Sequence, residues 1–478
     1  MEGAETASNI NPSDLSDVVG EYARADKAQA DSAIAAARAA FPAWSMSSVQ
    51  DRANLLDAVG NTILARKDEL GRLLSREEGK TLPEGIGEVV RAGQIFKFFG
   101  GEALRLAGEK IQSIRPGVDV EVTREPLGVI GIITPWNFPV AIPIWKIAPA
   151  LVAGNSVVFK PASLTPATAV RIVEIFEEAG IPPGVLNLVL GSGSDAGDEI
   201  ISHPAVKAIS FTGSNEVGIR MYEQVSRRGA KCQCEMGGKN PVVILEDADM
   251  DLTVESTAQG AFGSSGQRCT ATSRAVIVDQ VADEFVERLA KRAQSMRIGD
   301  GMDPQTEMGP SVDESQFRTV LDYLNIGRED GATLVCGGER ATGDGLDKGY
   351  FVRPTVFDHV TPDMRIAREE IFGPVLSVLR VRDFDEAMQV ANDTEYGLSS
   401  SIFTNDAARI FRFVEEIETG MTHINSPTTG GEAHIPFGGI KGTGIGDREQ
   451  GSTALDFYTE LKVVYVDYTG RKREGNLY

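Results

Sequence analysis

Cysteine and histidine are scarce in this chain, with only four of each among its 478 residues. The cysteines show no framework spacing, so they do not make a disulfide scaffold, and they indicate a reducing, cytoplasmic location. No Cys-x-x-Cys pair or histidine cluster occurs, and Cys232 and Cys234 stand too close together for a zinc knuckle. The sequence therefore predicts no metal site.

Long apolar runs, repeats and targeting signals are also missing. No apolar run approaches the roughly 20 residues that a membrane-spanning helix needs. Residues 1–16 are polar and acidic, without the basic and apolar regions of a signal peptide. There is no internal repeat, low-complexity segment or long linker, so we expect a globular cytoplasmic protein without a membrane partner.

Positive charge is in deficit. The chain has 47 lysines and arginines against 69 acidic residues, a formal net charge of −22. Nucleic acid is not an expected partner, because its binding needs a basic surface that neutralises phosphates. An anionic substrate or cofactor would have to be bound by local cations, against the overall field of the protein.

The remaining composition, 42% hydrophobic and 24% charged, is that of an ordinary globular protein. A chain of this length exceeds one hydrophobic core and predicts two or three domains. Strands are expected at 129–133, 156–160 and 186–190, with a helix at 167–179, and a second strand-and-helix series runs over 241–424. This alternation is typical of parallel sheets covered by helices.

Three amphipathic helices are expected before these series, and extended ribbons beside them. Helical periodicity covers 25–40, 51–75 and 84–106, with a break predicted at the glycine pair 100–101. Residues 110–124 alternate around a Pro-Gly turn, which predicts a two-stranded ribbon. Residues 459–468 are β-branched and aromatic, and would form an exposed apolar strand edge if left unpaired.

One cysteine differs from the other three in its surroundings. Cys269 follows the small and polar run 263–268 (GSSGQR), which offers no apolar face for packing a core cysteine. Gly263 and Gly266 allow the backbone to approach a ligand closely. A pocket thiol beside a cation such as Arg268 has a lowered pKa, so Cys269 is the candidate nucleophile.

A thiol nucleophile needs a base, and a carboxylate is a better candidate here than a histidine. His203 and His359 lie in contexts that do not look catalytic, while His423 and His434 flank a glycine turn and stay open. Glu235 stands before a glycine pair at the end of a short strand, where a glutamate can face a cleft. A solvated surface glutamate is the ordinary alternative.

Asn137 is the candidate donor to an oxyanion. It follows the expected buried strand 129–133 and lies between Pro135 and Pro139, which prevent a regular helix or strand at this position. A neutral amide suits this role because it donates hydrogen bonds without titrating. Ordinary turn chemistry is the alternative for an asparagine in such a context.

These three residues belong to a set of seven motifs that occur in one order along the chain. The motifs are 135–139 (PWNFP), 159–162 (FKPA), 211–214 (FTGS), 235–241 (EMGGKNP), 266–269 (GQRC), 370–374 (EIFGP) and 436–439 (PFGG). Together they resemble the aldehyde dehydrogenase superfamily, and the resemblance covers essentially the whole chain.

The resemblance implies an α/β fold with a doubly wound parallel-sheet cofactor domain, an α/β catalytic domain and a β-ribbon oligomerisation arm. We expect the cofactor domain at 1–107 and 127–236, the catalytic domain at 237–454, and the arm at 108–126 and 455–478. In this family such an arm adds to the sheet of a neighbouring subunit, so the expected assembly is a homodimer or homotetramer.

The resemblance also implies a nicotinamide dinucleotide, although no Gly-x-Gly-x-x-Gly follows a first strand and the nearest candidate, 191–197, is one residue too long. The helix after residue 214 would face the phosphates. The residues implied at this site are Trp136, Lys160, Ser163, Gly213, Ser214, Gly218, Glu370 and Phe372.

Cofactor choice is predicted from Ser163. In NAD-preferring members of the family, an acid that repels a 2′-phosphate often stands three residues beyond the conserved lysine, which is Lys160 here. Serine adds no repulsion, so NADP is expected to be accepted at least as well as NAD.

The implied reaction begins with addition of Cys269 to an aldehyde, with the oxyanion held by the Asn137 amide and the Cys269 backbone N–H. Hydride then leaves to the nicotinamide, and Glu235 activates the water that hydrolyses the thioester. Two alternatives belong to other classes. One is a CoA-acylating dehydrogenase, which typically lacks a glutamate at the place of Glu235, so the presence of Glu235 argues against it. The other is a non-catalytic protein of this fold, which often loses the nucleophile, whereas this chain retains Cys269.

The implied aldehyde tunnel is mostly apolar, with Ile142, Trp145 and Phe437 on its wall. Trp145 stands where many succinic semialdehyde enzymes of the family carry arginine. Segments 425–432 and 438–444 look like those of the bacterial α-ketoglutaric semialdehyde (2,5-dioxopentanoate) dehydrogenases. The expected substrate is therefore α-ketoglutaric semialdehyde, oxidised to 2-oxoglutarate, with succinic semialdehyde and aromatic or aliphatic aldehydes as alternatives.

Arg268 has two possible roles beside the nucleophile. Its guanidinium would either hold a substrate carboxylate or anchor the loop, and anchoring is favoured because arginine most often forms structural ion pairs at such positions.

Overall fold

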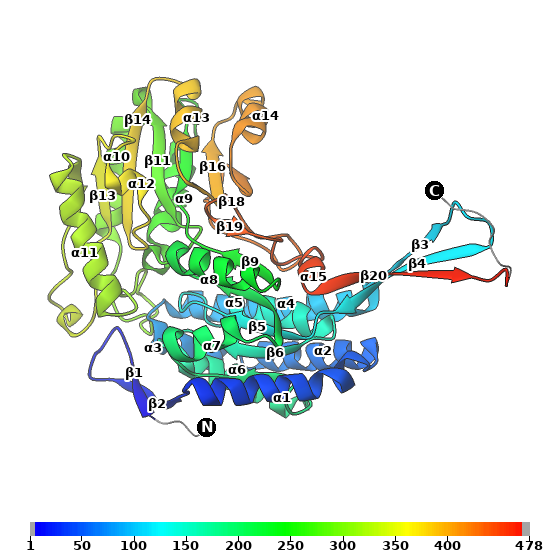
Figure 1. The fold of residues 1–478 in the computed structure, drawn as a ribbon. Coiled ribbons are helices and arrows are strands. Elements are labelled where there is room, and N and C mark those ends of the chain that lie inside the picture. Colours follow the sequence, from blue (N-terminus) through cyan, green and yellow to red (C-terminus); the bar gives the residue numbers. More distant parts are fainter. Residues whose placement is uncertain (1–4, 471–478) are drawn as a thin grey trace.

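The computed structural model describes residues 5–470, and Figure 1 shows two stacked α/β blocks with a ribbon projecting from one side. One block is built on a six-stranded sheet and the other on a seven-stranded sheet. Among the described residues, no helix is long and apolar enough to cross a membrane.

The six-stranded sheet has the order β19-β9-β8-β5-β6-β7, and within it only β19 runs antiparallel to its neighbour. Its strands are β5 (Val129–Ile133), β6 (Ser156–Lys160), β7 (Leu186–Leu188), β8 (Val206–Thr212), β9 (Lys231–Glu235) and β19 (Gly444–Ile445). Residues of β5 alternate between two cores, with Ile130 and Ile132 on one side and Val129 and Ile133 on the other. Both faces are buried, which explains the continuous apolar runs of the central strands.

Helices cover both faces of this sheet, so it is doubly wound as predicted. One face carries α2 (Val49–Ala65), α4 (Leu82–Glu102), α5 (Ala141–Val152) and α6 (Pro166–Glu178), with α3 (Lys67–Glu78) packed against α4. The other face carries α1 (Lys27–Ser45), α7 (Asp198–Ser202) and α8 (Asn215–Arg227). An N-terminal hairpin, β1 (Glu5–Ile10) and β2 (Val18–Arg24), lies beside this block in Figure 1.

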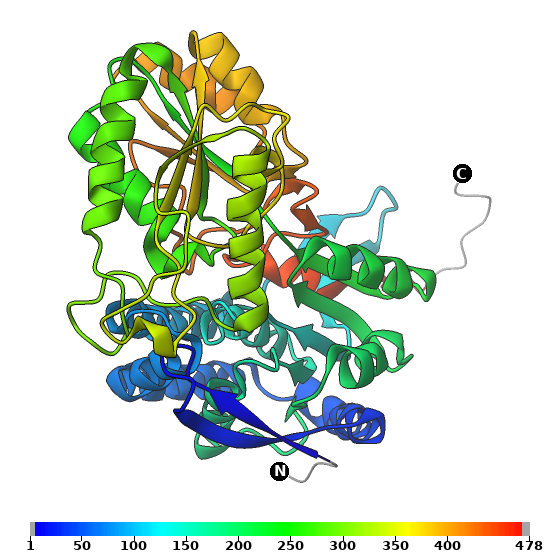
Figure 2. The same ribbon diagram turned by 90° about the vertical axis from the view of Figure 1, so that its left-hand side faces the viewer.

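The seven-stranded sheet has the order β12-β13-β14-β11-β10-β16-β17, and only β12 is antiparallel. Its strands are β10 (Asn240–Ile244), β11 (Thr272–Val278), β12 (Thr333–Cys336), β13 (Thr355–Asp358), β14 (Val375–Val381), β16 (Ser399–Phe403) and β17 (Met421–Ile424). One face packs on α9 (Met250–Phe262) and α10 (Asp279–Ser295). The other packs on α11 (Glu314–Glu329), α12 (Arg365–Arg368), α13 (Phe384–Asn392) and α14 (Ala407–Glu416), of which α11 stands in front in Figure 2.

The projecting ribbon is a three-stranded antiparallel sheet of β3 (Glu109–Gln112), β4 (Val118–Pro126) and β20 (Thr459–Asp467), which follows α15 (Ala454–Phe457). β20 pairs with β4 along its whole length. Large apolar side chains on β20 remain exposed, namely Leu461, Val463, Val464, Tyr465 and Val466. The predicted β-ribbon arm is therefore present as part of the α/β fold, and it presents an apolar surface.

Two helix predictions were wrong in detail. Residues 51–75 form α2 and α3, separated at Arg66, instead of one helix. Helix α4 does not break at Gly100 and Gly101 but continues to Glu102. A Cβ at Gly100 would lie at an ordinary contact distance, 3.4 Å, from the Ala53 carbonyl oxygen of α2, so this position is compatible with a continuous helix. The β1–β2 hairpin and α5 were not predicted.

Candidate active site

Four of the predicted site residues stand at the carboxyl ends of parallel strands. Asn137 follows β5, Lys160 ends β6, Gly213 follows β8 and Glu235 ends β9. Parallel strands place their carboxyl ends at one edge of a sheet, where open α/β sheets bind ligands. The topology thus gathers residues that are far apart in the sequence at this edge.

Cys269 reaches the same edge from the seven-stranded block, on the segment between α9 and β11. A tight left-handed turn precedes it, with positive φ at Ser264 (49°), Ser265 (56°) and Gly266 (69°). A Cβ at Gly266 would overlap the carbonyl oxygen of Gly373, so only glycine fits. This glycine approaches protein backbone, and not a ligand as the sequence suggested.

Hydrogen bonds to distant segments hold this turn. The backbone N–H of Ser264 donates to Glu84 of α4 at 2.7 Å, and the Ser265 hydroxyl donates to the Gly309 carbonyl at 2.7 Å. Gln267 accepts from the backbone N–H of Val312 at 2.9 Å. The loop that presents Cys269 is therefore fixed before any ligand binds.

Cys269 lies where two cavities meet. A cavity of about 280 Å³ is lined by predicted cofactor residues, namely Trp136, Gly213, Ser214, Glu370 and Phe372, together with Asn137. A second cavity of about 250 Å³ is lined by the predicted substrate residues Ile142, Trp145, Arg268 and Phe437. Cys269 and Ile142 line both cavities. A thiol in this position can contact ligands from both sides.

The first cavity has features that suit a nicotinamide dinucleotide. Ser214 precedes α8 without a side-chain cap, so N–H groups of the first turn are available to a phosphate. The Thr212 hydroxyl is buried and has no hydrogen-bond partner within residues 5–470. Trp136 and Phe372 meet edge to face with ring centroids 5.4 Å apart, giving the cavity an aromatic wall.

Glu370 supplies a carboxylate to this cavity. Burial raises its pKa to about 7, while a hydrogen bond from the backbone N–H of Gly238 at 2.8 Å opposes the rise. A Cβ at Gly237 would overlap this carboxylate, so a larger residue there would force the Glu370 side chain to move. Such a carboxylate can accept hydrogen bonds from ribose hydroxyls.

Lys160, Ser163 and Gly218 do not line the first cavity. Burial lowers the pKa of Lys160 to about 8, and its ammonium donates to the Pro161 carbonyl at 3.0 Å. The Ser163 hydroxyl donates to the Gly191 carbonyl at 3.3 Å. Both side chains therefore lie beside the glycine-rich segment 191–197, and Gly218 packs against Met236 in the core beneath α1, α7 and α8.

The Cys269 thiol has a raised pKa, of about 12, and not the lowered value expected from the sequence. Burial is the largest cause, followed by the charges of Glu370 and Glu235. Arg268 does not offset them, because its guanidinium forms an ion pair with Glu84 at 2.9 Å and hydrogen bonds with the Ser264 hydroxyl. A thiol in this environment needs a proton acceptor before it can attack.

Glu235 ends β9 and lines neither cavity, but its charge acts on the Cys269 thiol. It is only 4% exposed, and its Oε2 has no hydrogen-bond partner in the described part of the chain. Burial, and then the charge of Glu449, raise its pKa well above the ordinary value. Glu449 is itself paired with Lys146 and accepts a hydrogen bond from Trp145 at 2.6 Å. Glu235 therefore holds its proton at neutral pH more firmly than a surface glutamate.

Two hydrogen-bond donors flank the thiol. The Asn137 side chain is 3% exposed, and its Nδ2 donates to the Gln267 carbonyl at 3.0 Å, which leaves one amide N–H unused. The backbone N–H of Cys269 donates to no acceptor among residues 5–470. An oxyanion formed at Cys269 can receive both donors.

The second cavity is mostly apolar. The rings of Trp145 and Phe437 lie 5.4 Å apart, and Phe138 adds a third ring to the wall. Sequence reasoning missed Arg91 of α4, which also lines this cavity. An arginine in an amphipathic helix is typical of a solvated face, so no local signal distinguished it.

Neither candidate histidine lines either cavity. His423 lies within β17, and burial lowers its pKa. His434 is exposed and lies 3.6 Å from Glu432. Glu235 does not line the cavities either, but its charge raises the pKa of the Cys269 thiol, so the carboxylate remains the candidate base.

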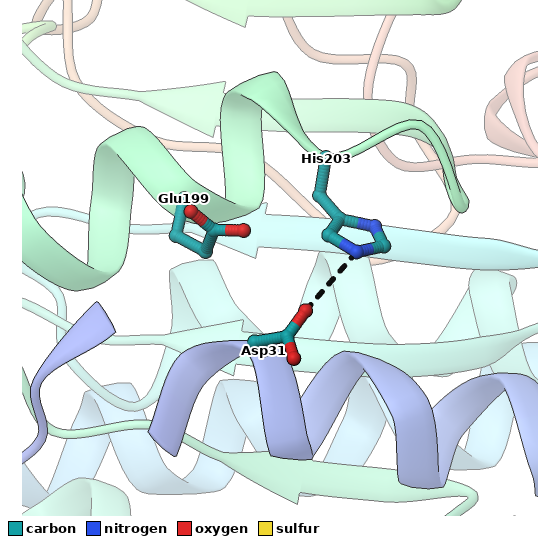
Figure 3. Close-up of side chains that lie close together, drawn as sticks. All are labelled: Asp31, Glu199 and His203. Carbon is teal, nitrogen blue, oxygen red and sulfur yellow. Dashed lines mark ion pairs between the residues drawn. The ribbon is translucent and has the colours of Figure 1, made fainter. Parts of the chain in front are cut away.

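Figure 3 shows a separate group of side chains, Asp31, Glu199 and His203, at the contact between α1 and α7. His203 lies 3.2 Å from Asp31, and the Lys27 ammonium lies 3.0 Å from Glu199. Because an ammonium already compensates Glu199, these groups form ion pairs between two helices, and we do not assign a metal to them.

Comparisons with known proteins agree with this geometry. The model of the Aldehyde dehydrogenase family matches residues 1–464. The chain is 46% identical to the alpha-ketoglutarate semialdehyde dehydrogenase of Haloferax volcanii, over 98% of this chain and 97% of that protein. It is 44% identical to the alpha-ketoglutaric semialdehyde dehydrogenase of Bacillus subtilis, over 95% and 93%.

A solved structure is similar over the whole fold. Betaine aldehyde dehydrogenase from Staphylococcus aureus, in complex with NAD+, has a TM-score of 0.96 and 36% identity, covering 99% of this chain and 94% of that chain. The two cavities, the thiol between them and these matches lead to one conclusion: the chain belongs to the aldehyde dehydrogenase family.

Proposed function

We propose that this aldehyde dehydrogenase oxidises α-ketoglutaric semialdehyde to 2-oxoglutarate, with NADP or NAD as the oxidant. The position of Cys269 at the junction of the two cavities carries the chemistry, since one cavity suits a dinucleotide and the other an aldehyde. The substrate is supported by the names of the two relatives at 46% and 44% identity.

In the proposed mechanism, Glu235 acts in its deprotonated form, and its raised pKa makes it a stronger base than a surface glutamate. Cys269 attacks the aldehyde carbon, and the thiol proton passes to the Glu235 carboxylate. The negative charge that develops on the aldehyde oxygen is stabilised by the free N–H of Asn137 and the backbone N–H of Cys269. A nicotinamide dinucleotide held beside Trp136, Glu370 and Phe372 would supply the acceptor for a hydride from the substrate carbon. Glu235 releases the thiol proton to solvent and then takes a proton from water, whose oxygen attacks the thioester carbon on Cys269. The Cys269 thiolate leaves and takes that proton back from Glu235, which gives the carboxylic acid and the free thiol.

We propose that the enzyme accepts NADP at least as well as NAD. Ser163 offers no negative charge to repel a 2′-phosphate, and the Lys160 ammonium lies in the same neighbourhood. The solved relative described above is a complex with NAD+.

We also propose that the ribbon of β3, β4 and β20 joins this chain to further copies of itself in a homodimer or homotetramer. The exposed apolar side chains of β20 support this proposal, because an unpaired apolar strand edge promotes association. The four free cysteines support a reducing, cytoplasmic location.

Steady-state formation of reduced cofactor tests the substrate proposal. α-Ketoglutaric semialdehyde should give the highest kcat/KM in a panel with succinic semialdehyde and benzaldehyde, and CoA should not be required. A higher kcat/KM for benzaldehyde would refute the proposed substrate, and strict dependence on CoA would refute the hydrolytic step.

A further inference from the structure

One charged side chain in the second cavity lacks an opposite charge. Four acidic or basic side chains lie on the wall besides the Cys269 thiol. Arg268 pairs with Glu84 at 2.9 Å, and Glu88 pairs with Lys80 at 2.7 Å. Arg91 forms no ion pair with any carboxylate of residues 5–470. The cavity therefore presents one uncompensated positive charge.

Neutral groups hold Arg91 in place. Its Nη2 donates to the side-chain oxygen of Gln450 at 3.0 Å, and its guanidinium carbon lies 5.7 Å from the centroid of the Trp145 ring. Its Nε is buried and has no acceptor within the described residues. Enclosing an unpaired cation is unfavourable, so this arrangement favours an anion in the same cavity.

Glu88 and Glu432 both act on Arg91 electrostatically. Glu88 is already paired with Lys80, and the side chain of Glu432 is largely exposed and lies 3.6 Å from His434. Solvent screens such an exposed carboxylate. It does not replace a partner inside the cavity.

We propose that Arg91 binds the carboxylate of the aldehyde substrate and selects aldehydes that carry an acid at the far end. The inference rests on the proposed function, since α-ketoglutaric semialdehyde has an aldehyde at one end and a carboxylate at the other. A guanidinium matches a carboxylate with two parallel hydrogen bonds. Cys269 and Arg91 line the same cavity, and the apolar walls between them suit the carbon chain.

We assign Arg268 to anchoring the loop that carries Cys269. Its charge is neutralised by Glu84, and its hydrogen bonds fix the turn before Cys269. Loss of Arg268 should therefore impair all aldehydes alike, whereas loss of Arg91 should impair only those with a carboxylate.

The test compares kcat and KM of the wild type and Arg91→Met for α-ketoglutaric semialdehyde, succinic semialdehyde and the uncharged pentanal. We expect KM for both acids to rise at least about tenfold in Arg91→Met, because a charge-assisted hydrogen-bonded pair is lost. KM for pentanal should change less than about twofold, since an apolar chain makes no use of the charge. Arg91→Lys should recover part of the affinity for acids, because lysine supplies the positive charge but cannot form the two parallel hydrogen bonds of a guanidinium.

Two variants serve as controls. Lys97→Met removes a cation from the same helix outside the cavity, where Lys97 pairs with Asp57, and should leave the ratio of acid to pentanal unchanged. Arg268→Met should lower kcat/KM for acids and pentanal by the same factor.

If Arg91→Met does not fold, Arg91→Gln takes its place, with inhibition of pentanal oxidation by 2-oxoglutarate as the readout. Weaker inhibition in Arg91→Gln than in the wild type supports the inference, and equal inhibition overturns it. An equal rise in KM for acids and pentanal in either variant also overturns it, because Arg91 would then only support the wall.

Failure of the inference and failure of the proposed substrate give different results. If the wild type prefers α-ketoglutaric semialdehyde and the Arg91 variants keep that preference, only the inference fails. If the wild type prefers another aldehyde but the Arg91 variants still lose acids selectively, only the proposed substrate fails.

Discussion

Gly266→Ala should disable the enzyme by displacing the loop that carries Cys269. Gly266 has a φ of +69°, and a Cβ there would overlap the Gly373 carbonyl oxygen. The added methyl group would meet the backbone of Gly373 and Pro374, which cannot move aside as the end of a flexible side chain could. The loop must therefore move.

The expected cost has two parts. An alanine in the left-handed region costs about 1 kcal/mol relative to glycine. Overpacking against a rigid neighbour adds about 1–3 kcal/mol, giving a total of about 2–4 kcal/mol. Displacement of a nucleophile by about 1 Å can lower turnover by roughly 10²-fold.

Gly343→Ala separates the two contributions. Gly343 also has a positive φ, of +81°, but nothing lies within 4 Å of the added Cβ. This control should cost only about 1 kcal/mol and should leave turnover unchanged, since the loop is remote from both cavities.

The two variants are compared by urea unfolding, by kcat/KM and by the rate of Cys269 alkylation with iodoacetamide. Gly266→Ala should show a large loss in kcat/KM and an altered alkylation rate, with its unfolding midpoint below that of Gly343→Ala. If Gly266→Ala behaves like Gly343→Ala in all three measurements, the close approach to Gly373 does not fix the nucleophile.

Two further predictions concern charge. Ser163→Glu should shift preference toward NAD and raise KM for NADP roughly five- to tenfold. A carboxylate near the 2′-phosphate weakens NADP binding by on the order of 1 kcal/mol. A wild type already strongly selective for NAD would show that another group excludes the 2′-phosphate. Burial raises the pKa of Glu235, so the folded protein binds a proton that the unfolded chain releases, and stability should fall as pH rises above the ordinary carboxyl range. Thermal unfolding across pH should show this loss in the wild type and a flatter profile in Glu235→Gln, and identical profiles would contradict the raised pKa.

The sequence predicted the site better than it predicted the electrostatics of the site. Cys269 was a recognisable candidate because small and polar residues precede it, and Asn137 because Pro135 and Pro139 bracket it. Glu235 was recognisable because a strand ends there. Local sequence is sufficient for such judgements, since each depends on residues within a few positions.

The prediction of a lowered pKa for the Cys269 thiol was wrong, because the groups that determine this pKa are distant in the sequence. Arg268 is adjacent to Cys269, but its ion-pair partner Glu84 lies 184 residues earlier in the chain. Arg91 was missed for a similar reason, since its place in the second cavity depends on how α4 packs beside α5. Helix α4 continues through Gly100 and Gly101 while packed along α2, and that tertiary packing is not visible in the local helix propensity.

The central claim is that Cys269 forms a thioester that Glu235 helps to hydrolyse, and intact-protein mass spectrometry tests it most directly. Glu235→Gln is mixed with α-ketoglutaric semialdehyde and NADP, quenched in acid and digested to locate any adduct. The account predicts an acyl adduct on the peptide that contains Cys269, a matching burst of NADPH, and neither in the double variant Cys269→Ala/Glu235→Gln. An acyl adduct on another residue, or an NADPH burst that persists without Cys269, would contradict it.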